Sequence, residues 1–158
     1  VYHYLVSPLI LLIGSNYLQY KLASVVVGGG VVLVTYLTAK EWAGGRGGLI
    51  ASFVAALSFW TIVWARTGNS QIIIPVWSGL VLWGAERYRR TNKAKPIVIA
   101  VLSAAAGLFT YPQSFVLPVV LILLLALTRS WKGVVIAIVG LLPAVFLWGG
   151  IVKKNLDN

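Results

Sequence analysis

The run PIVIAVLSAAAGLFTYPQSFVLPVVLILLLALT, residues 96–128, contains no charged residue over 33 positions. A single helix of that length would extend about 50 Å, whereas about 20 residues cross a hydrocarbon core of roughly 30 Å. Its centre, residues 110–114, reads Thr-Tyr-Pro-Gln-Ser, a cluster that favours a turn and interrupts a helix. The run therefore predicts a hairpin of two short helices, residues 96–109 and 115–128.

The charged residues divide the rest of the chain into further apolar runs. Four of these runs are each long enough for one crossing: residues 22–39, 47–65, 67–85 and 133–152. Residues 1–20 predict a juxtamembrane segment or a partial span, and residues 22–152 predict a helix bundle. We therefore expect an all-α, polytopic transmembrane bundle of about six spans, including the hairpin. It would form a single transmembrane domain over residues 1–158, as a partial chain.

The composition supports a membrane protein and excludes several other classes. Hydrophobic residues make up 59% of the chain and charged residues 10%, whereas soluble domains carry about a quarter charged residues. The absence of cysteine excludes a disulfide scaffold, a zinc ribbon and a thiol enzyme. One histidine and three scattered acids offer no metal site of the His/carboxylate kind. Because no methionine is present, we expect a fragment, a processed product or part of a longer protein.

The distribution of cations predicts how the chain is oriented. Lys and Arg accumulate on the cytoplasmic side of membrane proteins, and the hairpin puts nine cations on one side and four on the other. A single crossing over residues 96–128 gives the same tally, so helix length decides in favour of the hairpin. ERYRRTNKAK, residues 86–95, is then a cytoplasmic loop that sets the topology or binds anionic lipid headgroups. The net charge of +10 needs no nucleic acid to explain it.

The glycines and other small residues predict helix contacts. Residues 28–30 are three glycines without the following Lys-Ser or Lys-Thr of a phosphate loop, and residues 44–48 lack the third glycine of a dinucleotide fingerprint. Close helix packing and a flexible loop explain them better. Small residues at helical spacing also predict a helix–helix contact face: Ala100, Ser103, Ala104 and Gly107.

A small polar set remains for the outer side. Lys21 precedes the first full span, and Arg66 begins the connection between the second and third spans. An arginine at a span end snorkels to the interface or binds an anion, and two cations without a nearby acid suit a phosphate. The hairpin is too short to reach the far interface easily, so its polar tip would line a cavity. The candidate ligands of a lipid phosphate or substrate are therefore Lys21, Arg66, Asn69, Tyr111 and Gln113.

Three segments, in this order, resemble a known family. They are YHYLVSPLILLIGSNYLQYKLAS (2–24), LTAKEWAGGRGGLIASFVAALSFWTIVWART (37–67) and AAAGLFTYPQSFVLPVVLILL (104–124). Together they are similar to the GT-C type membrane glycosyltransferases, in the group that contains protein O-mannosyltransferases and lipid A aminoarabinose transferases. The family's Leu-Pro-Ser element appears here as Leu22-Ala23-Ser24, with alanine in place of proline.

The resemblance implies a function and a donor. A sugar would move from a polyprenyl-phosphate carrier to a protein or glycolipid acceptor at the outer face of the membrane. In the family a carboxylate of the first outward loop acts as the base, and that loop would precede residue 1, so no catalytic residue is expected in this chain. By position, Lys21 and Arg66 would hold the lipid phosphate and stabilise the leaving group. No cofactor beyond the lipid-linked donor follows from the resemblance.

A second interpretation belongs to another class. The chain would then be a non-catalytic membrane scaffold or a partner-binding subunit with the same fold. An Asp or Glu pair shortly upstream of residue 1 would favour the enzyme. In both cases we expect an integral protein of the cell membrane, or of the endoplasmic reticulum in a eukaryote. It would contact membrane lipids and the rest of the polypeptide or a partner subunit.

Overall fold

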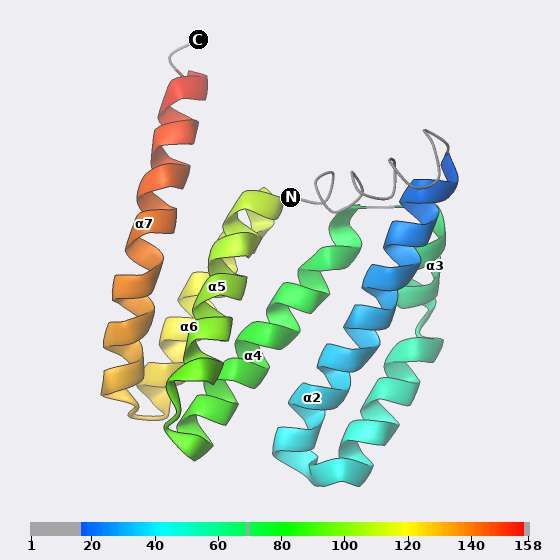
Figure 1. The fold of residues 1–158 in the computed structure, drawn as a ribbon, viewed down its shortest axis with the longest axis horizontal. Helices are drawn as coiled ribbons and strands as arrows, with labels where there is room; N and C mark the ends of the chain where they lie inside the picture. Colours follow the sequence, from blue (N-terminus) through cyan, green and yellow to red (C-terminus); the bar gives the residue numbers. More distant parts are fainter. Residues whose placement is uncertain (1–16, 69, 157–158) are drawn as a thin grey trace. The chain divides into compact units, whose positions relative to one another are not determined.

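The described part of the chain is helical throughout. The computed structural model describes residues 17–68 and 70–156, and within them no strand forms (Figure 1). The prediction of an all-α protein is confirmed. The elements are α2 (Tyr17–Leu57), α3 (Phe59–Thr67), η1 (Ser70–Ile72), α4 (Ile73–Thr91), α5 (Ala94–Thr110), η2 (Pro112–Phe115), α6 (Val116–Leu127) and α7 (Trp131–Leu156).

The hairpin predicted over residues 96–128 is present. Tyr111 ends α5 in an extended conformation, with φ −155° and ψ 138°, and the short 3-10 helix η2 turns the chain into α6. The Ser114 backbone N–H donates to the carbonyl of Tyr111 at 2.9 Å, which closes the turn. Pro112 begins η2, where its missing N–H costs no helical hydrogen bond.

The helix α2 is two helical arms joined at one residue. Gly44 has φ 72° and ψ −176°, a conformation that is essentially confined to glycine, and the chain reverses there (Figure 1). A Cβ on Gly48 would lie 3.0 Å from the Tyr36 carbonyl oxygen, so the two arms approach closely beside the turn. The glycine-rich stretch predicted as a flexible loop is therefore a sharp turn within a helical segment.

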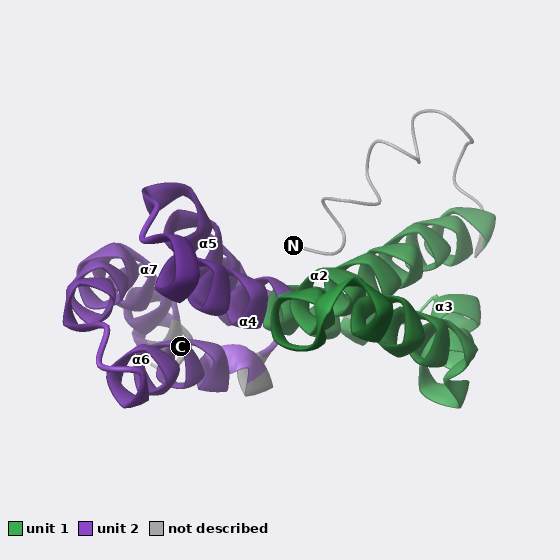
Figure 2. Ribbon diagram, turned by 90° about the horizontal axis from the view of Figure 1, so that it is seen from below, with its two compact units in different colours: residues 1–79 green, residues 80–158 purple. Residues whose placement is uncertain are grey.

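The chain divides into two compact units, residues 1–79 and 80–158, with the boundary inside α4 (Figure 2). The single domain expected over residues 1–158 stays a prediction. In the first unit, glycines bring α2 against its neighbours. A Cβ on Gly28 would lie 3.2 Å from the Ala65 Cβ in α3, and one on Gly79 would lie 2.6 Å from a Val34 methyl. The close packing predicted for residues 28–30 is thus confirmed at Gly28.

The second unit is built around α5. Its buried face includes all four small residues that the sequence predicted for a contact face: Ala100, Ser103, Ala104 and Gly107. Gly84 of α4 faces Ala100, Gly140 of α7 faces Val101, and Gly107 faces Leu117 of α6, each with 2.8 Å between the side-chain atom and an added Cβ. Glycines thus let three helices approach α5.

Two helical segments are long and apolar enough to cross a membrane, judged by length and composition. They are Leu18–Leu57, with mean hydropathy 2.0, and Trp131–Ile151, with mean hydropathy 2.5. Only 33% and 22% of their most apolar windows are buried, so most of this apolar surface faces outward. An apolar helix with an exposed surface is suited to lipid rather than to water. α5 and α6 are shorter apolar helices.

Two boundaries differ from the sequence prediction. The span expected over residues 47–65 is interrupted at Ser58, which has φ −61° and ψ 129° and separates α2 from α3. The loop expected over residues 86–95 is largely helical, because α4 continues to Thr91 and α5 begins at Ala94. The turn between these two helices is confined to Asn92 and Lys93, and Asn92 adopts a positive φ of 52°.

The reversal at Gly44 leads to a stability prediction. We expect Gly44→Ala to lower the free energy of unfolding by about 1–3 kcal/mol, because a Cβ is strained at this φ and ψ. The matched control is Gly45→Ala, since Gly45 is helical and a Cβ there meets no atom within 4 Å. The measurement is denaturant unfolding of both variants in the same detergent. Equal stability of the two variants would contradict the role given to Gly44.

Candidate functional site

The first unit brings Lys21 and Arg66 to the same end. Lys21 lies in the N-terminal arm of α2, and Arg66 lies in the last turn of α3. Gly68 ends α3 with φ 71°, and a Cβ added there would lie 3.3 Å from the Tyr20 Cβ and 3.5 Å from the Tyr20 carbonyl carbon. The end of α3 therefore packs directly on the residue that precedes Lys21.

The charge at this end is positive. Arg66 is exposed and Lys21 is half-buried. The acid described in this unit, Glu41, lies in the same helical arm as Lys21 but 20 residues further along, which corresponds to about 30 Å. It is too far away to pair with Arg66, whose exposed guanidinium an anion can reach.

Two buried polar side chains beside Lys21 were missed by the sequence analysis. Gln19 is 1% exposed and Ser24 is fully buried. Among the described residues the Gln19 Nε2 has no hydrogen-bond partner. Buried polar groups are normally hydrogen-bonded, so this unpaired amide is an exception in the described part of the chain. The signal for Gln19 in the sequence is weak, because this residue stands among other polar residues near the start of the first span.

An aromatic-lined cavity lies in the same unit. It has a volume of about 220 Å³ and is lined by Val31, Trp60, Thr61, Trp64, Ile72 and Pro75. Trp60 and Trp64 are packed edge to face, with ring centroids 6.0 Å apart. Trp64 is in the last turns of α3, two residues before Arg66. An apolar cavity is therefore present on the helix that carries one of the two cations.

The tip of the hairpin forms a second cavity, in the second unit. Tyr111 lines it together with Thr110 and Trp148, and its volume is about 250 Å³. The remaining lining residues are Leu108, Phe109 and Ile151. Ser114, in η2, is 2% exposed, and its Oγ has no hydrogen-bond partner among the described residues. The tip therefore combines an aromatic wall with buried polar atoms.

The five predicted ligand residues fall into separate groups. Lys21 and Arg66 belong to the first unit, whereas Tyr111 and Gln113 belong to the hairpin tip of the second. Gln113 lies in η2. Asn69 lies outside the described residues. The structure thus packs the end of α3, which carries Arg66, against the α2 segment that carries Lys21.

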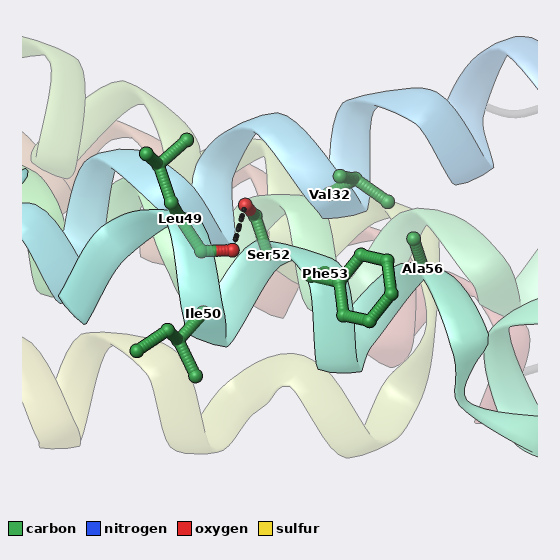
Figure 3. Close-up of a pocket in the computed structure, with 6 residues that line it drawn as sticks. All are labelled: Val32, Leu49, Ile50, Ser52, Phe53 and Ala56. Carbon is green, nitrogen blue, oxygen red and sulfur yellow. Dashed lines mark hydrogen bonds between the residues drawn. The ribbon is translucent and has the colours of Figure 1, made fainter. Parts of the chain in front are cut away.

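A further groove, in the first unit, has no such polar chemistry. Figure 3 shows the residues that line it: Val32 from one arm of α2, and Leu49, Ile50, Ser52, Phe53 and Ala56 from the other. Its volume is about 550 Å³. The Ser52 hydroxyl donates to the Leu49 carbonyl oxygen at 3.0 Å, so the polar side chain of the groove is already used within the helix (Figure 3). The groove is an apolar surface rather than a reaction site.

Glu86 sits in an ion-pair network just beyond the apolar run 67–85. Its carboxylate accepts hydrogen bonds from Arg89 Nε at 2.8 Å, Arg89 Nη2 at 2.6 Å and Arg90 Nε at 2.6 Å. These bonds, above all those from Arg89, lower the pKa of Glu86 from 4.5 to about 2, although partial burial opposes the shift. Glu86 is thus ionised and bound by arginines, and does not act as a base near neutral pH.

This network predicts a pH dependence. Replacing Glu86→Gln should lower the free energy of unfolding at neutral pH by less than about 1 kcal/mol, because exposed i,i+3 and i,i+4 pairs contribute little each. A lowered carboxyl pKa stabilises the fold above the unfolded value of 4.5, and that contribution is lost as the pH falls towards about 2. The measurement is the stability difference between variant and wild type across this range. A difference as large near pH 2 as at neutral pH would contradict the prediction.

The chain is similar to a known protein family. A family model described as dolichyl-phosphate-mannose-protein mannosyltransferase matches residues 1–148. No curated protein and no solved structure matches the chain. The family match covers most of the sequence, including every predicted ligand residue. It also covers the residues that line the cavities of about 220 and 250 Å³, with the exception of Ile151.

Proposed function

Because the chain belongs to the dolichyl-phosphate-mannose-protein mannosyltransferase family, a family of membrane glycosyltransferases, we propose that it transfers a sugar from a polyprenyl-phosphate carrier. The acceptor is a protein or a glycolipid, and transfer takes place at the outer face of the membrane. The membrane is the cell membrane, or that of the endoplasmic reticulum in a eukaryote.

The observation that carries this proposal is the packing of Gly68 on Tyr20. It supports a phosphate site at one end of the first unit, because it brings the α3 terminus with Arg66 to the α2 segment with Lys21. A phosphate between a guanidinium and an ammonium gains charge-assisted hydrogen bonds from both.

The cations assist the reaction at the leaving group. The acceptor hydroxyl oxygen forms a bond to the anomeric carbon while the bond from that carbon to the phosphate oxygen breaks. The lipid phosphate departs with the electron pair, and Lys21 and Arg66 stabilise its growing negative charge. The hydroxyl proton passes to a carboxylate base, the general base that the family resemblance implies.

Each unit has a cavity whose lining suits one kind of ligand group. The cavity of about 220 Å³ lined by Trp60 and Trp64 is apolar, which suits an isoprene unit next to the phosphate. The cavity of about 250 Å³ at the hairpin tip, within the second unit, offers Tyr111 and Trp148 as stacking surfaces, which suits a sugar ring of a substrate. We assign Asn69 and Gln113 to substrate binding as well.

The phosphate site predicts a loss of transfer. In the full-length protein, Lys21→Ala and Arg66→Ala should each reduce sugar transfer from the lipid donor by about 100-fold or more, while membrane insertion is unchanged. The control is Lys153→Ala, which removes a cation from the end of α7. The measurement is transfer of radiolabelled sugar in membranes containing equal amounts of each variant. Normal turnover in both test variants would refute the phosphate site.

The topology gives an independent prediction. The chain contains no cysteine, so single cysteines can be introduced without background. A cysteine at Gln113 should react with an impermeant maleimide in intact cells, because the hairpin tip faces outward. A cysteine at Lys93 should react only after permeabilisation. Labelling of both positions from the same side would refute the orientation.

A further inference from the structure

The ends of four helices lie at one end of the second unit. α4 ends at Thr91 and α5 begins at Ala94, while α6 ends at Leu127 and α7 begins at Trp131. These connections are so short that each forms a tight turn between consecutive helices. Both turns contain a residue with positive φ, Asn92 at 52° and Arg129 at 55°.

The two turns are held next to each other by buried contacts. Tyr88, one turn before the end of α4, is only 4% exposed. A Cβ on Gly133, in the first turn of α7, would lie 2.6 Å from the Tyr88 Cε1 and 3.1 Å from a Leu125 methyl. Residues about 45 positions apart in sequence therefore pack together, and their turns form one surface.

This surface, which we term the basic end, has a large excess of positive charge. Its single acid is Glu86, whose carboxylate forms salt bridges with Arg89 and Arg90. Seven cations against one carboxylate leave a net charge of +6. The seven cations are Arg87, Arg89, Arg90, Lys93, Lys95, Arg129 and Lys132.

The basic end lies where apolar helix surface begins. Leu127 and Trp131 flank the second turn and are 81% and 67% exposed. The apolar segment Trp131–Ile151 starts at the same place, so the cations of this turn adjoin the first residues of an apolar helix. Exposed tryptophan is typical of the headgroup region of a membrane. A ligand that fits here needs a negative headgroup and an apolar tail.

We propose that the basic end binds anionic phospholipids through their headgroup phosphates. The positive-inside rule accounts for the number of cations but does not require two separate turns to be packed into one surface. Basic surfaces between membrane helices on the cytoplasmic side are suited to such headgroups. The proposal is independent of sugar transfer, because it uses none of the residues assigned to the donor.

The test compares lipid binding by native mass spectrometry of the purified full-length protein. We expect phosphatidylglycerol to be retained at least fivefold more than phosphatidylcholine, and the preference to fall several-fold in the double variant Arg129→Gln/Lys132→Gln. The matched control is Lys153→Gln/Lys154→Gln, which removes the same charge from the other end of α7 and should keep the preference.

A second double variant, Lys93→Gln/Lys95→Gln, changes the other turn and should lower the preference in the same way. This variant keeps the proposal testable if the first one does not fold. Equal retention of the two lipids by the wild type would overturn the proposal. So would an equal loss in the Lys153/Lys154 control, since it would show a general effect of net charge.

Discussion

Both units depend on the close approach of helix backbones at glycines. Inside a membrane, apolar side chains gain little by leaving lipid for protein, so association depends on close packing and on hydrogen bonds. In the first unit, Gly79 lets α4 reach Val34, and the Thr38 hydroxyl then donates to the Gly79 carbonyl at 3.1 Å. In the second unit, Gly84 and Gly140 let α4 and α7 pack closely against α5. A larger side chain at these positions would push the helices apart.

The same kind of contact underlies both proposed binding surfaces. Gly68 brings the terminus of α3 onto Tyr20, and Gly133 brings α7 onto Tyr88. In each case a residue without a side chain lets a tyrosine pack against the backbone, and cations near the contact are gathered as a result. Helix packing thus determines where the cations gather. A larger side chain at either glycine would therefore weaken ligand binding at that surface and also lower the stability of the fold.

The predictable parts of the fold follow from local signals. The hairpin was expected because Pro112 and the polar residues around it interrupt a run too long for one span, and η2 forms there. The contact face of α5 followed from the spacing of its small residues. The break at Ser58 was missed because no glycine or proline marks it. The charged segment after Ala85 was predicted as a loop, but pairs of Glu86 with Arg89 and Arg90 support the helical continuation of α4.

The sequence by itself determined that the protein is helical and built for a membrane, because hydropathy and helix length are properties of each segment alone. It also indicated the cations and the tip residues as candidate ligands. Only the tertiary structure decided that Lys21 and Arg66 share one end, that Gln19 and Ser114 are buried, and that the two basic turns adjoin. These features arise from contacts between segments distant in sequence, which depend on how side chains and glycines of different helices fit together.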